Sequence, residues 1–341
     1  MNDTPWYPTS DELRQARERL KPYVLMTPLL RAEALEIHGR RVFIKPENLQ
    51  RTGSFKIRGA ANAILSLQLD ARDRGVVTFS SGNHGAAVAF AAREIGNADR
   101  GQPYPCTVVM PENASRIKAE RVEMFGAEVV YYGKTVAERQ AKAEELARQS
   151  GKDVIPSYDD RRVICGQGSI GPEIMDQWMG FPSRTRRLYI VAGPVGGGGL
   201  MGGTSAALRA RGFSGRIVGV EPETANDTEK SFAAGEQVET PLSDTICDGL
   251  RSTMPGELTF PILKKCVDSI ATVSDEEVQT AMKWLLSEMK ILVEPSGAVA
   301  VAAWMNGKLS IHEHDPQNPD FAGDVILIVS GGNVDPAAVV Q

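Results

Sequence analysis

Short apolar runs alternate with longer amphipathic segments along most of the chain. The short runs are rich in β-branched residues and predict strands at 41–45, 76–79, 107–110, 128–132, 188–191, 217–220 and 325–329. The longer segments have apolar residues at helical spacing and predict helices at 83–95, 115–125, 135–149, 204–211 and 275–290. Strands that alternate with helices in this order predict an α/β fold with mostly parallel sheets.

The strand at 188–191 reads Leu-Tyr-Ile-Val, so apolar side chains occupy both of its faces. A parallel sheet that is covered by helices on both sides requires strands of this kind. Ligands of open α/β sheets bind at the carboxyl ends of the strands, so we expect the chemistry in the loops that follow strands.

Composition narrows the classes of function. The chain has 341 residues, which is enough for two domains, because single cores stop growing near roughly 250–300 residues. Its net charge of -5 argues against nucleic acid as a partner, since phosphates demand a basic face. We find no apolar run long enough to span a bilayer and no signal-peptide pattern, so we expect a cytoplasmic protein. The cysteines show no C-x-x-C spacing, which argues against a zinc knuckle.

One loop after a predicted strand contains four consecutive glycines followed by a leucine: Gly196, Gly197, Gly198, Gly199 and Leu200. Backbone N–H groups of such a loop can converge on an anion, and the N-terminus of the helix that follows adds partial positive charge. Phosphate is the natural ligand. The Walker pattern is absent, which disfavours a nucleoside triphosphate cradle.

The same loop also fits a dinucleotide fingerprint. Gly197, Gly199 and Gly202 match G-x-G-x-x-G, and Glu221 ends a strand about 20 residues later, where a ribose-binding acid is expected. On these residues alone, an NAD-dependent oxidoreductase is an alternative, and so are glycines that serve only a tight turn.

A second loop reads Ser-Ser-Gly-Asn-His-Gly over 80–85. The hydroxyl groups of Ser80 and Ser81, the Asn83 amide and the N–H groups of the following helix can hold a carboxylate or a phenolate. The alternative is a helix cap and turn. His84 is open to two interpretations, a substrate contact or a histidine whose hydrogen bonds are satisfied on the helix face.

A third segment reads Ser-Phe-Lys-Ile-Arg-Gly-Ala over 54–60, at the start of a helical run. Phe55 and Ile57 flank Lys56, and desolvation by such neighbours favours a neutral, nucleophilic amine. An ordinary exposed helix lysine is the alternative for any single lysine, but its combination with the other two motifs favours a chemical role.

These motifs occur in order across almost the whole chain, and Val-Ser-Gly-Gly-Asn-Val at 329–334 follows them. Together they resemble the fold-type II pyridoxal-phosphate enzymes, specifically the branch of serine/threonine dehydratases and serine racemases. The resemblance implies the tryptophan synthase β-like fold, with two domains, each an open, mostly parallel twisted sheet covered by helices. We expect a large domain at 1–70 plus 155–341, a small mobile domain at 71–154, and a homodimer.

The resemblance also implies roles toward pyridoxal 5′-phosphate. Lys56 matches the lysine that holds the cofactor as a Schiff base and then moves the proton of the substrate's Cα atom. Phe55 matches the residue on the ring face, and Asn83 the partner of the ring's 3′-oxygen. Ser330 matches the partner of the pyridine nitrogen. The glycine loop with Leu200 matches the phosphate cradle, which favours phosphate over a dinucleotide.

A family of this kind implies an ammonia-lyase that converts a threonine- or serine-type amino acid to a 2-oxo acid and ammonia. The alternatives within the branch are a 3-hydroxyaspartate dehydratase and a serine racemase, and a catalytically inert ligand-binding relative is a further one. The segment at 156–161, Pro-Ser-Tyr-Asp-Asp-Arg, departs from the family's usual His-Pro-Tyr/Phe-Asp-Asp-Pro pattern. The identity of the substrate therefore stays open.

Four residues are candidates for the substrate site under this resemblance, together with Ser80. Ser81 matches the second base of the racemase branch, and His84 lies in the same loop. Arg139 aligns with an arginine that contacts a dicarboxylate ligand and would favour 3-hydroxyaspartate through a charge-assisted pair, unless it is simply solvated. Ser252 is the fourth candidate.

A last match is the segment that follows the strand at 217–220. Glu221, the Ala225 carbonyl and Asp227 resemble the divalent-cation site of the racemase branch, with oxygen ligands suited to Mg²⁺ or Ca²⁺. The alternative is a strand-end acid and a helix-capping aspartate.

Overall fold

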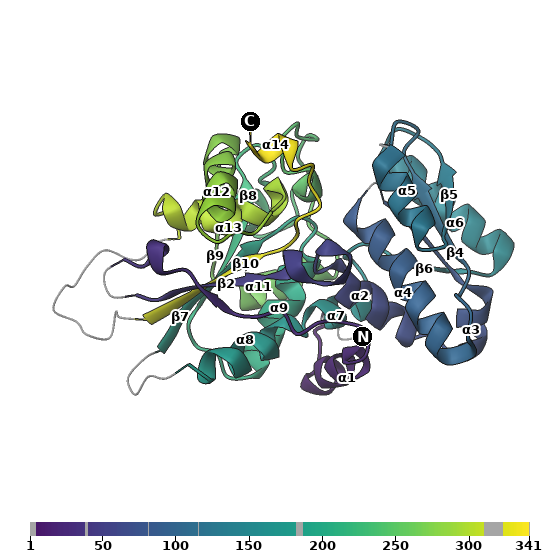
Figure 1. Cartoon of the computed structure of the whole chain (residues 1–341), viewed down its shortest axis with the longest axis horizontal. Coiled ribbons are helices and arrows are strands. Elements are labelled where there is room, and N and C mark those ends of the chain that lie inside the picture. Colours follow the sequence, from purple (N-terminus) through teal and green to yellow (C-terminus); the bar gives the residue numbers. More distant parts are fainter. Residues whose placement is uncertain are drawn as a thin grey trace. The chain divides into compact units, whose positions relative to one another are not determined.

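The structure, a computed structural model, describes residues 5–37, 40–80, 82–114, 116–181, 187–309 and 323–340. The chain forms two compact units, which can be followed by colour in Figure 1. Unit 1 comprises Met1–Tyr7, Met26–Phe55 and Ile170–Gln341, and unit 2 comprises Pro8–Leu25 and Lys56–Ser169.

Unit 1 is built on a six-stranded sheet within the described residues. Its strands lie in the order β1 (Leu30–Arg31), β2 (Val42–Pro46), β10 (Gly323–Val329), β7 (Arg187–Pro194), β8 (Arg216–Pro222) and β9 (Ser269–Val273). Every neighbouring pair is parallel except β1 with β2. The prediction of a mostly parallel sheet is therefore confirmed for this unit.

Helices cover both faces of the unit 1 sheet. Those described are α8 (Ile170–Met179), α9 (Gly199–Ala210), α10 (Asp227–Ala234), α11 (Thr259–Cys266), α12 (Asp275–Ser287), α13 (Pro295–Met305) and α14 (Ala337–Val340). Short 3-10 turns lie at η1 (Glu33–Leu35), η2 (Glu47–Leu49), η3 (Arg51–Gly53) and η4 (Asp248–Leu250).

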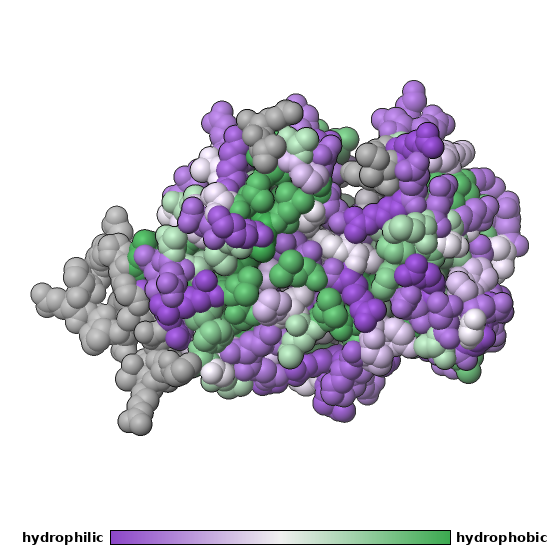
Figure 2. Space-filling view, in the orientation of Figure 1, coloured by the Kyte–Doolittle hydropathy of each residue, from purple (hydrophilic) through white to green (hydrophobic). Residues whose placement is uncertain are grey.

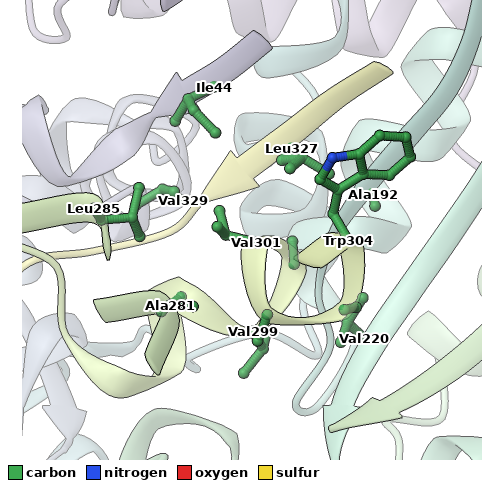
Figure 3. Packing of buried hydrophobic residues seen from close by; sticks show 14 of the residues in the cluster. Ile44, Ala192, Val220, Ala281, Leu285, Val299, Val301, Trp304, Leu327 and Val329 are labelled. Atoms are coloured by element: carbon green, nitrogen blue, oxygen red, sulfur yellow. The ribbon is translucent and has the colours of Figure 1, made fainter. Parts of the chain in front are cut away.

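Alternate residues of β10 separate the two cores of unit 1. Leu327 and Val329 pack with α12 and α13 on one face, whereas Ile326 and Ile328 pack with α8, α9 and α11 on the other. Figure 3 shows the first core, where Val301 of α13 lies near the strand residues. Each fully buried aliphatic side chain contributes roughly 1.5–3 kcal/mol, so this two-sided burial holds the sheet rigid beneath the loops at its carboxyl edge.

Unit 2 contains a four-stranded parallel sheet with the order β5 (Glu128–Tyr131), β4 (Cys106–Met110), β3 (Val76–Phe79) and β6 (Asp153–Val154). Its described helices are α1 (Ser10–Leu20), α2 (Lys56–Leu65), α3 (Leu69–Arg74), α4 (Asn83–Arg100), α5 (Arg116–Met124), α6 (Val136–Ser150) and α7 (Arg161–Gln167). Val76 and Val108 pack with α4, whereas their neighbours Val77 and Val109 pack with α6. Helices α4 and α6 therefore cover opposite faces of this sheet.

The bounds of unit 2 differ from those expected for the small domain, 71–154. The segments 8–25, 56–70 and 155–169 also belong to this compact unit. The reason is helix packing, because α2 packs along both α4 and α7, and α1 packs on α2 and α7. A small domain that moves stays a proposal.

The surface carries scattered apolar side chains among polar ones, as the face in Figure 2 shows. Leu69, Met124 and Leu242, for example, are each more than 60% exposed and lie far apart in the sequence. Single exposed apolar residues of this kind are normal and require no partner. No helix in the described ranges has both the length and the apolar character needed to cross a membrane.

Candidate active site

The glycine loop lies between β7 and α9 at the carboxyl edge of the unit 1 sheet. Helix α9 begins at Gly199, five residues earlier than the sequence predicted, so the loop supplies the first turn of the helix. The early start follows from close packing, because α9 lies against both α8 and α11 and small residues fit such contacts. Gly198 precedes the helix with φ +92°, a left-handed conformation that favours glycine.

This loop fits a phosphate group. The N-cap residue of α9 is Gly198, which has no side chain to accept hydrogen bonds from the first-turn N–H groups as the cap residues of most helices do. Gly196 and Gly197 are half-buried, and their lack of a side chain leaves the backbone open to a ligand. A dianionic ligand with several acceptor oxygens matches these donors and the positive end of the helix.

Ser330 ends β10 and is 4% exposed. Its hydroxyl lies 3.4 Å from the Ser296 carbonyl oxygen, and its own carbonyl accepts a hydrogen bond of 3.0 Å from the Phe55 amide. The structure thus brings Ser330 and Phe55, two of the predicted cofactor residues, together within unit 1. Glu294, which no sequence motif indicates, lies so close to Gly331 that a Cβ atom on this glycine would lie 2.2 Å from the Glu294 Oε1 atom.

Lys56 is the first residue of α2, where the sequence predicted that a helix begins. It is also the first residue of the second segment of unit 2, Lys56–Ser169. Its side chain is half-buried, and its Nζ atom donates a hydrogen bond of 2.9 Å to the Ser157 carbonyl. The segment at 156–161, which departs from the family pattern, therefore supplies a backbone contact to the lysine. No sequence pattern signals that contact, since any residue can offer a carbonyl.

The Ser-Ser-Gly-Asn-His-Gly loop joins β3 to α4 at the carboxyl edge of the unit 2 sheet. The Ser80 hydroxyl accepts a hydrogen bond of 3.2 Å from the Gly82 amide, and Asn83 opens the helix. Gly85 allows the helix to approach β4, because a Cβ atom there would lie 2.9 Å from a methyl of Val108. Ser81 lies outside the described residues.

His84 is buried, with only 3% of its surface exposed, and its two ring nitrogens differ in their hydrogen bonds. Its Nε2 atom lies 3.0 Å from the Ile155 carbonyl, so this nitrogen carries the proton and donates. Its Nδ1 atom is buried without a hydrogen-bond partner among the described residues. Burial, and then the positive charge of Lys56, lower the pKa of His84 to about 3. The ring is therefore neutral at physiological pH, and Nδ1 is a free acceptor.

Arg139 lies in the first turn of α6 and is 8% exposed, so it is not a solvated surface residue. It donates one hydrogen bond of 3.1 Å to the Lys134 carbonyl, while its buried Nε atom finds no partner in the described part of the chain. Burial lowers the pKa of its guanidinium. Helix α6 follows β5 and packs on β3 and β4, so Arg139, in its first turn, and Ser80 both follow strands of the unit 2 sheet.

Glu221 and Asp227 form a buried acidic pair at the carboxyl end of β8, and both are 0% exposed. Glu221 accepts hydrogen bonds from the amides of Thr228 at 3.2 Å and Glu229 at 2.9 Å. Both carboxylate oxygens of Asp227 lack a hydrogen-bond partner among the described residues. Burial, and then the charge of Asp227, raise the pKa of Glu221 well above its usual value.

Burial also raises the pKa of Asp227 to about 7, opposed by its own backbone amide, by the Ser252 hydroxyl and by Lys230. Buried carboxylate oxygens without donors are costly unless a cation or a proton compensates them. Ala225, the third predicted ligand, is 1% exposed in the same turn, and its amide donates to the Pro222 carbonyl at 3.0 Å. The three predicted cation ligands are therefore all buried, and Ser252 lies near Asp227.

The same burial weakens the dinucleotide alternative. A ribose-binding acid must present its carboxylate to the ligand, but Glu221 is fully buried and already accepts two backbone amides. The glycine fingerprint therefore lacks its acidic partner.

Comparison with known proteins gives the same family as the sequence motifs. Residues 20–331 match the family described as "Pyridoxal-phosphate dependent enzyme". The chain is 36% identical to a serine racemase of Arabidopsis thaliana over 95% of this chain and 92% of that protein. It is 39% identical to an L-threo-3-hydroxyaspartate ammonia-lyase of Pseudomonas sp over 94% of each chain. The solved structure of a T.th. threonine deaminase superimposes with a TM-score of 0.83 at 38% identity, over 96% of this chain and 99% of that one.

The match spans most of the chain and includes the segments that carry Lys56, the glycine loop and Ser330. The predicted family and fold class are confirmed. The chain belongs to the fold-type II pyridoxal-phosphate dependent enzymes, in the branch that contains the serine/threonine dehydratases and serine racemases.

Proposed function

We propose that the protein is a pyridoxal-phosphate dependent ammonia-lyase that converts a threonine- or serine-type hydroxy amino acid to a 2-oxo acid and ammonia. The observation that carries this proposal is the glycine-lined N-terminus of α9, whose cap residue is Gly198, in a chain whose family is described as pyridoxal-phosphate dependent enzymes. Relatives with ammonia-lyase activity cover nearly the whole chain, which supports elimination as the reaction.

The resemblance gives candidate partners of the cofactor in both units. In unit 1, the glycine loop would bind the phosphate, Ser330 the pyridine nitrogen, and Phe55 the ring face. In unit 2, Lys56 would bind the aldehyde carbon and Asn83 the 3′-oxygen. The half-buried state of Lys56 and its hydrogen bond of 2.9 Å to the Ser157 carbonyl support this role, because the amine is partly shielded from water and held in place.

When bound, pyridoxal phosphate supplies an aldehyde for the substrate amine and a ring that delocalises negative charge from the substrate's Cα atom. Lys56 would then remove the proton at Cα, which is the step that permits loss of the β-hydroxyl group. A neutral partner such as the Ser330 hydroxyl does not force protonation of the ring nitrogen. This weaker electron sink suits elimination, which needs less delocalisation than transamination.

The identity of the substrate's side chain is a separate question. The burial of Arg139 supports a substrate with two carboxylates. A buried guanidinium with an unused Nε–H donor is stabilised by a carboxylate that arrives with the substrate. We therefore propose 3-hydroxyaspartate as a substrate beside threonine and serine. Ser80 and His84 in unit 2, and Ser252 in unit 1, stay candidates for contacts to the substrate.

The acidic pair supports a structural or activating cation. The buried carboxylates of Glu221 and Asp227, together with the Ala225 carbonyl, would form an oxygen donor set suited to Mg²⁺ or Ca²⁺. A divalent cation would compensate the unpartnered oxygens of Asp227. This site would hold the chain around the strand end rather than take part in the reaction.

A racemase is the second candidate, since a relative of similar identity carries that name. Ser81 would supply the second base. Homodimer formation and a cytoplasmic location stay predictions from the resemblance and composition.

The test is a panel of serine, threonine and 3-hydroxyaspartate stereoisomers, assayed in parallel for 2-oxo acid and for inverted amino acid, with and without Mg²⁺. We expect oxo acid from at least one hydroxy amino acid. A yellow protein that gives neither product would be an inert ligand-binding relative, and inversion without oxo acid would make the racemase the correct assignment.

A further inference from the structure

Thr259 lies beside the glycine loop although neither motif nor spacing singled it out. It is 0% exposed and is the first residue of α11, the helix that packs on α9. Its hydroxyl donates a hydrogen bond of 2.6 Å to the carbonyl oxygen of Gly197. The Gly256 carbonyl oxygen lies 3.3 Å from the same hydroxyl. Because a hydroxyl has a single proton, it donates to the nearer acceptor, the Gly197 carbonyl.

This hydrogen bond fixes the orientation of one peptide unit in the loop. The Gly197 carbonyl and the Gly198 N–H belong to the same planar trans peptide, so they point in opposite directions. Because the carbonyl points to Thr259, the N–H points away from α11. The N–H is thereby held on the side of the loop opposite Thr259.

The loop needs such a restraint from outside. Glycine residues flank this peptide on both sides, and glycine rotates its backbone at little steric cost. The other donor to the Gly197 carbonyl is the Gly256 amide at 3.3 Å, which is longer than an ordinary N–H···O bond. Space is also limited on this side, because a Cβ atom on Gly198 would lie 2.7 Å from the Thr259 Oγ1 atom.

We propose that Thr259 is a positioning residue that orients the Gly198 amide toward the phosphate group of the cofactor. The proposal rests on the proposed binding of pyridoxal phosphate, and it names a determinant of phosphate affinity outside the loop itself. Thr259 touches neither cofactor nor substrate in this role. It acts through the peptide that it holds.

The test compares two ligands that differ only in the phosphate. Apoenzyme is titrated with pyridoxal phosphate and with pyridoxal, and both dissociation constants are measured for wild type and for Thr259→Val, which keeps the shape of the side chain but loses the donor. We expect the variant to bind pyridoxal phosphate about 5–50-fold more weakly, the loss of one to two hydrogen-bond contributions, while pyridoxal binding is unchanged. Thr259→Ser should restore the wild-type ratio.

Thr107→Val is the matched control, because Thr107 is also a buried threonine whose hydroxyl is hydrogen-bonded, but it lies in β4 of unit 2. Thr259→Ala provides a second variant should Thr259→Val not fold, and the ³¹P chemical shift of bound cofactor should move in either one. Equal losses for the two ligands, or no loss for either, would overturn the role of Thr259. A wild-type protein that binds neither ligand would overturn the proposed function itself.

Discussion

Replacement of Asp227 by asparagine should stabilise the protein at alkaline pH when no divalent cation is present. Asp227 is fully buried, its two carboxylate oxygens lack hydrogen-bond partners in the described chain, and Glu221 lies beside it. Burial raises its pKa from 3.8 to about 7. Asparagine has almost the same shape but no charge, so the variant isolates the electrostatic cost.

The sign and size of the effect follow from this pKa. A carboxyl group whose pKa is raised by folding contributes stability below its unfolded pKa, and this contribution is lost as pH rises through the folded value. The loss therefore spans the range from about pH 4 to about pH 7. The difference between a pKa of 3.8 and one of about 7 corresponds, at 1.36 kcal/mol per pH unit, to a cost of at most about 4 kcal/mol above pH 7.

The assay is denaturant unfolding at pH 5 and pH 8, each in EDTA and in excess Mg²⁺. Wild type in EDTA should lose stability between the two pH values, and Mg²⁺ should restore about 2.7 kcal/mol at a concentration 100-fold above its dissociation constant. Asp227→Asn should lose the response to Mg²⁺ and should show a smaller pH-dependent loss than wild type, because burial still raises the pKa of Glu221 in the variant. Asp244→Asn, in an exposed position nearby, serves as the control and should behave as wild type. If Asp227→Asn destabilises the protein equally at both pH values, or if wild type does not respond to Mg²⁺, the account of this pair is wrong.

Three further predictions concern the reaction. Lys56→Ala should lower turnover of any substrate by at least about 1,000-fold, because it removes the amine that binds the cofactor and moves the Cα proton. The control variant Lys283→Ala, at an exposed position, should keep wild-type turnover. Retained turnover in Lys56→Ala would exclude Lys56 as the cofactor-binding lysine. Arg139→Ala should lower kcat/KM for 3-hydroxyaspartate about 10–100-fold and leave kcat/KM for threonine unchanged. Arg148→Ala, at an exposed position on the same helix, is the control. Equal losses on both substrates would contradict the proposal of a dicarboxylate substrate. Ser81→Ala should reduce inversion of serine while elimination largely survives, and a parallel collapse of the two rates would contradict a role as second base.

The sequence predicted the strands of both sheets well where they are long and apolar on both faces. The prediction at 325–329 lies within β10 (Gly323–Val329), whose side chains feed cores on both sides. It missed β9 (Ser269–Val273), an edge strand that is mostly half-buried, because its pattern lacks a clear apolar face. Burial alone does not explain the difference, because β5 is an even less buried edge strand and was predicted at 128–132 from its Val-Val-Tyr-Tyr run.

Only part of the candidate site could be predicted from the sequence. Motifs named Lys56 and the glycine loop, since glycine runs and a lysine between apolar residues are visible in the sequence itself. Thr259 and Ser157 were not visible, because the first acts on a glycine 62 residues away and the second through a backbone carbonyl. Long-range contacts of this kind depend on how helices pack, which no local pattern encodes.

The most direct measurement of the central claim is reduction of the purified protein with sodium borohydride, followed by peptide mass spectrometry. We expect the yellow absorption to disappear and a phosphopyridoxyl group to be found on Lys56 of the Ser-Phe-Lys-Ile-Arg segment. A colourless protein, or a phosphopyridoxyl group on another lysine, would contradict the claim that Lys56 binds the cofactor.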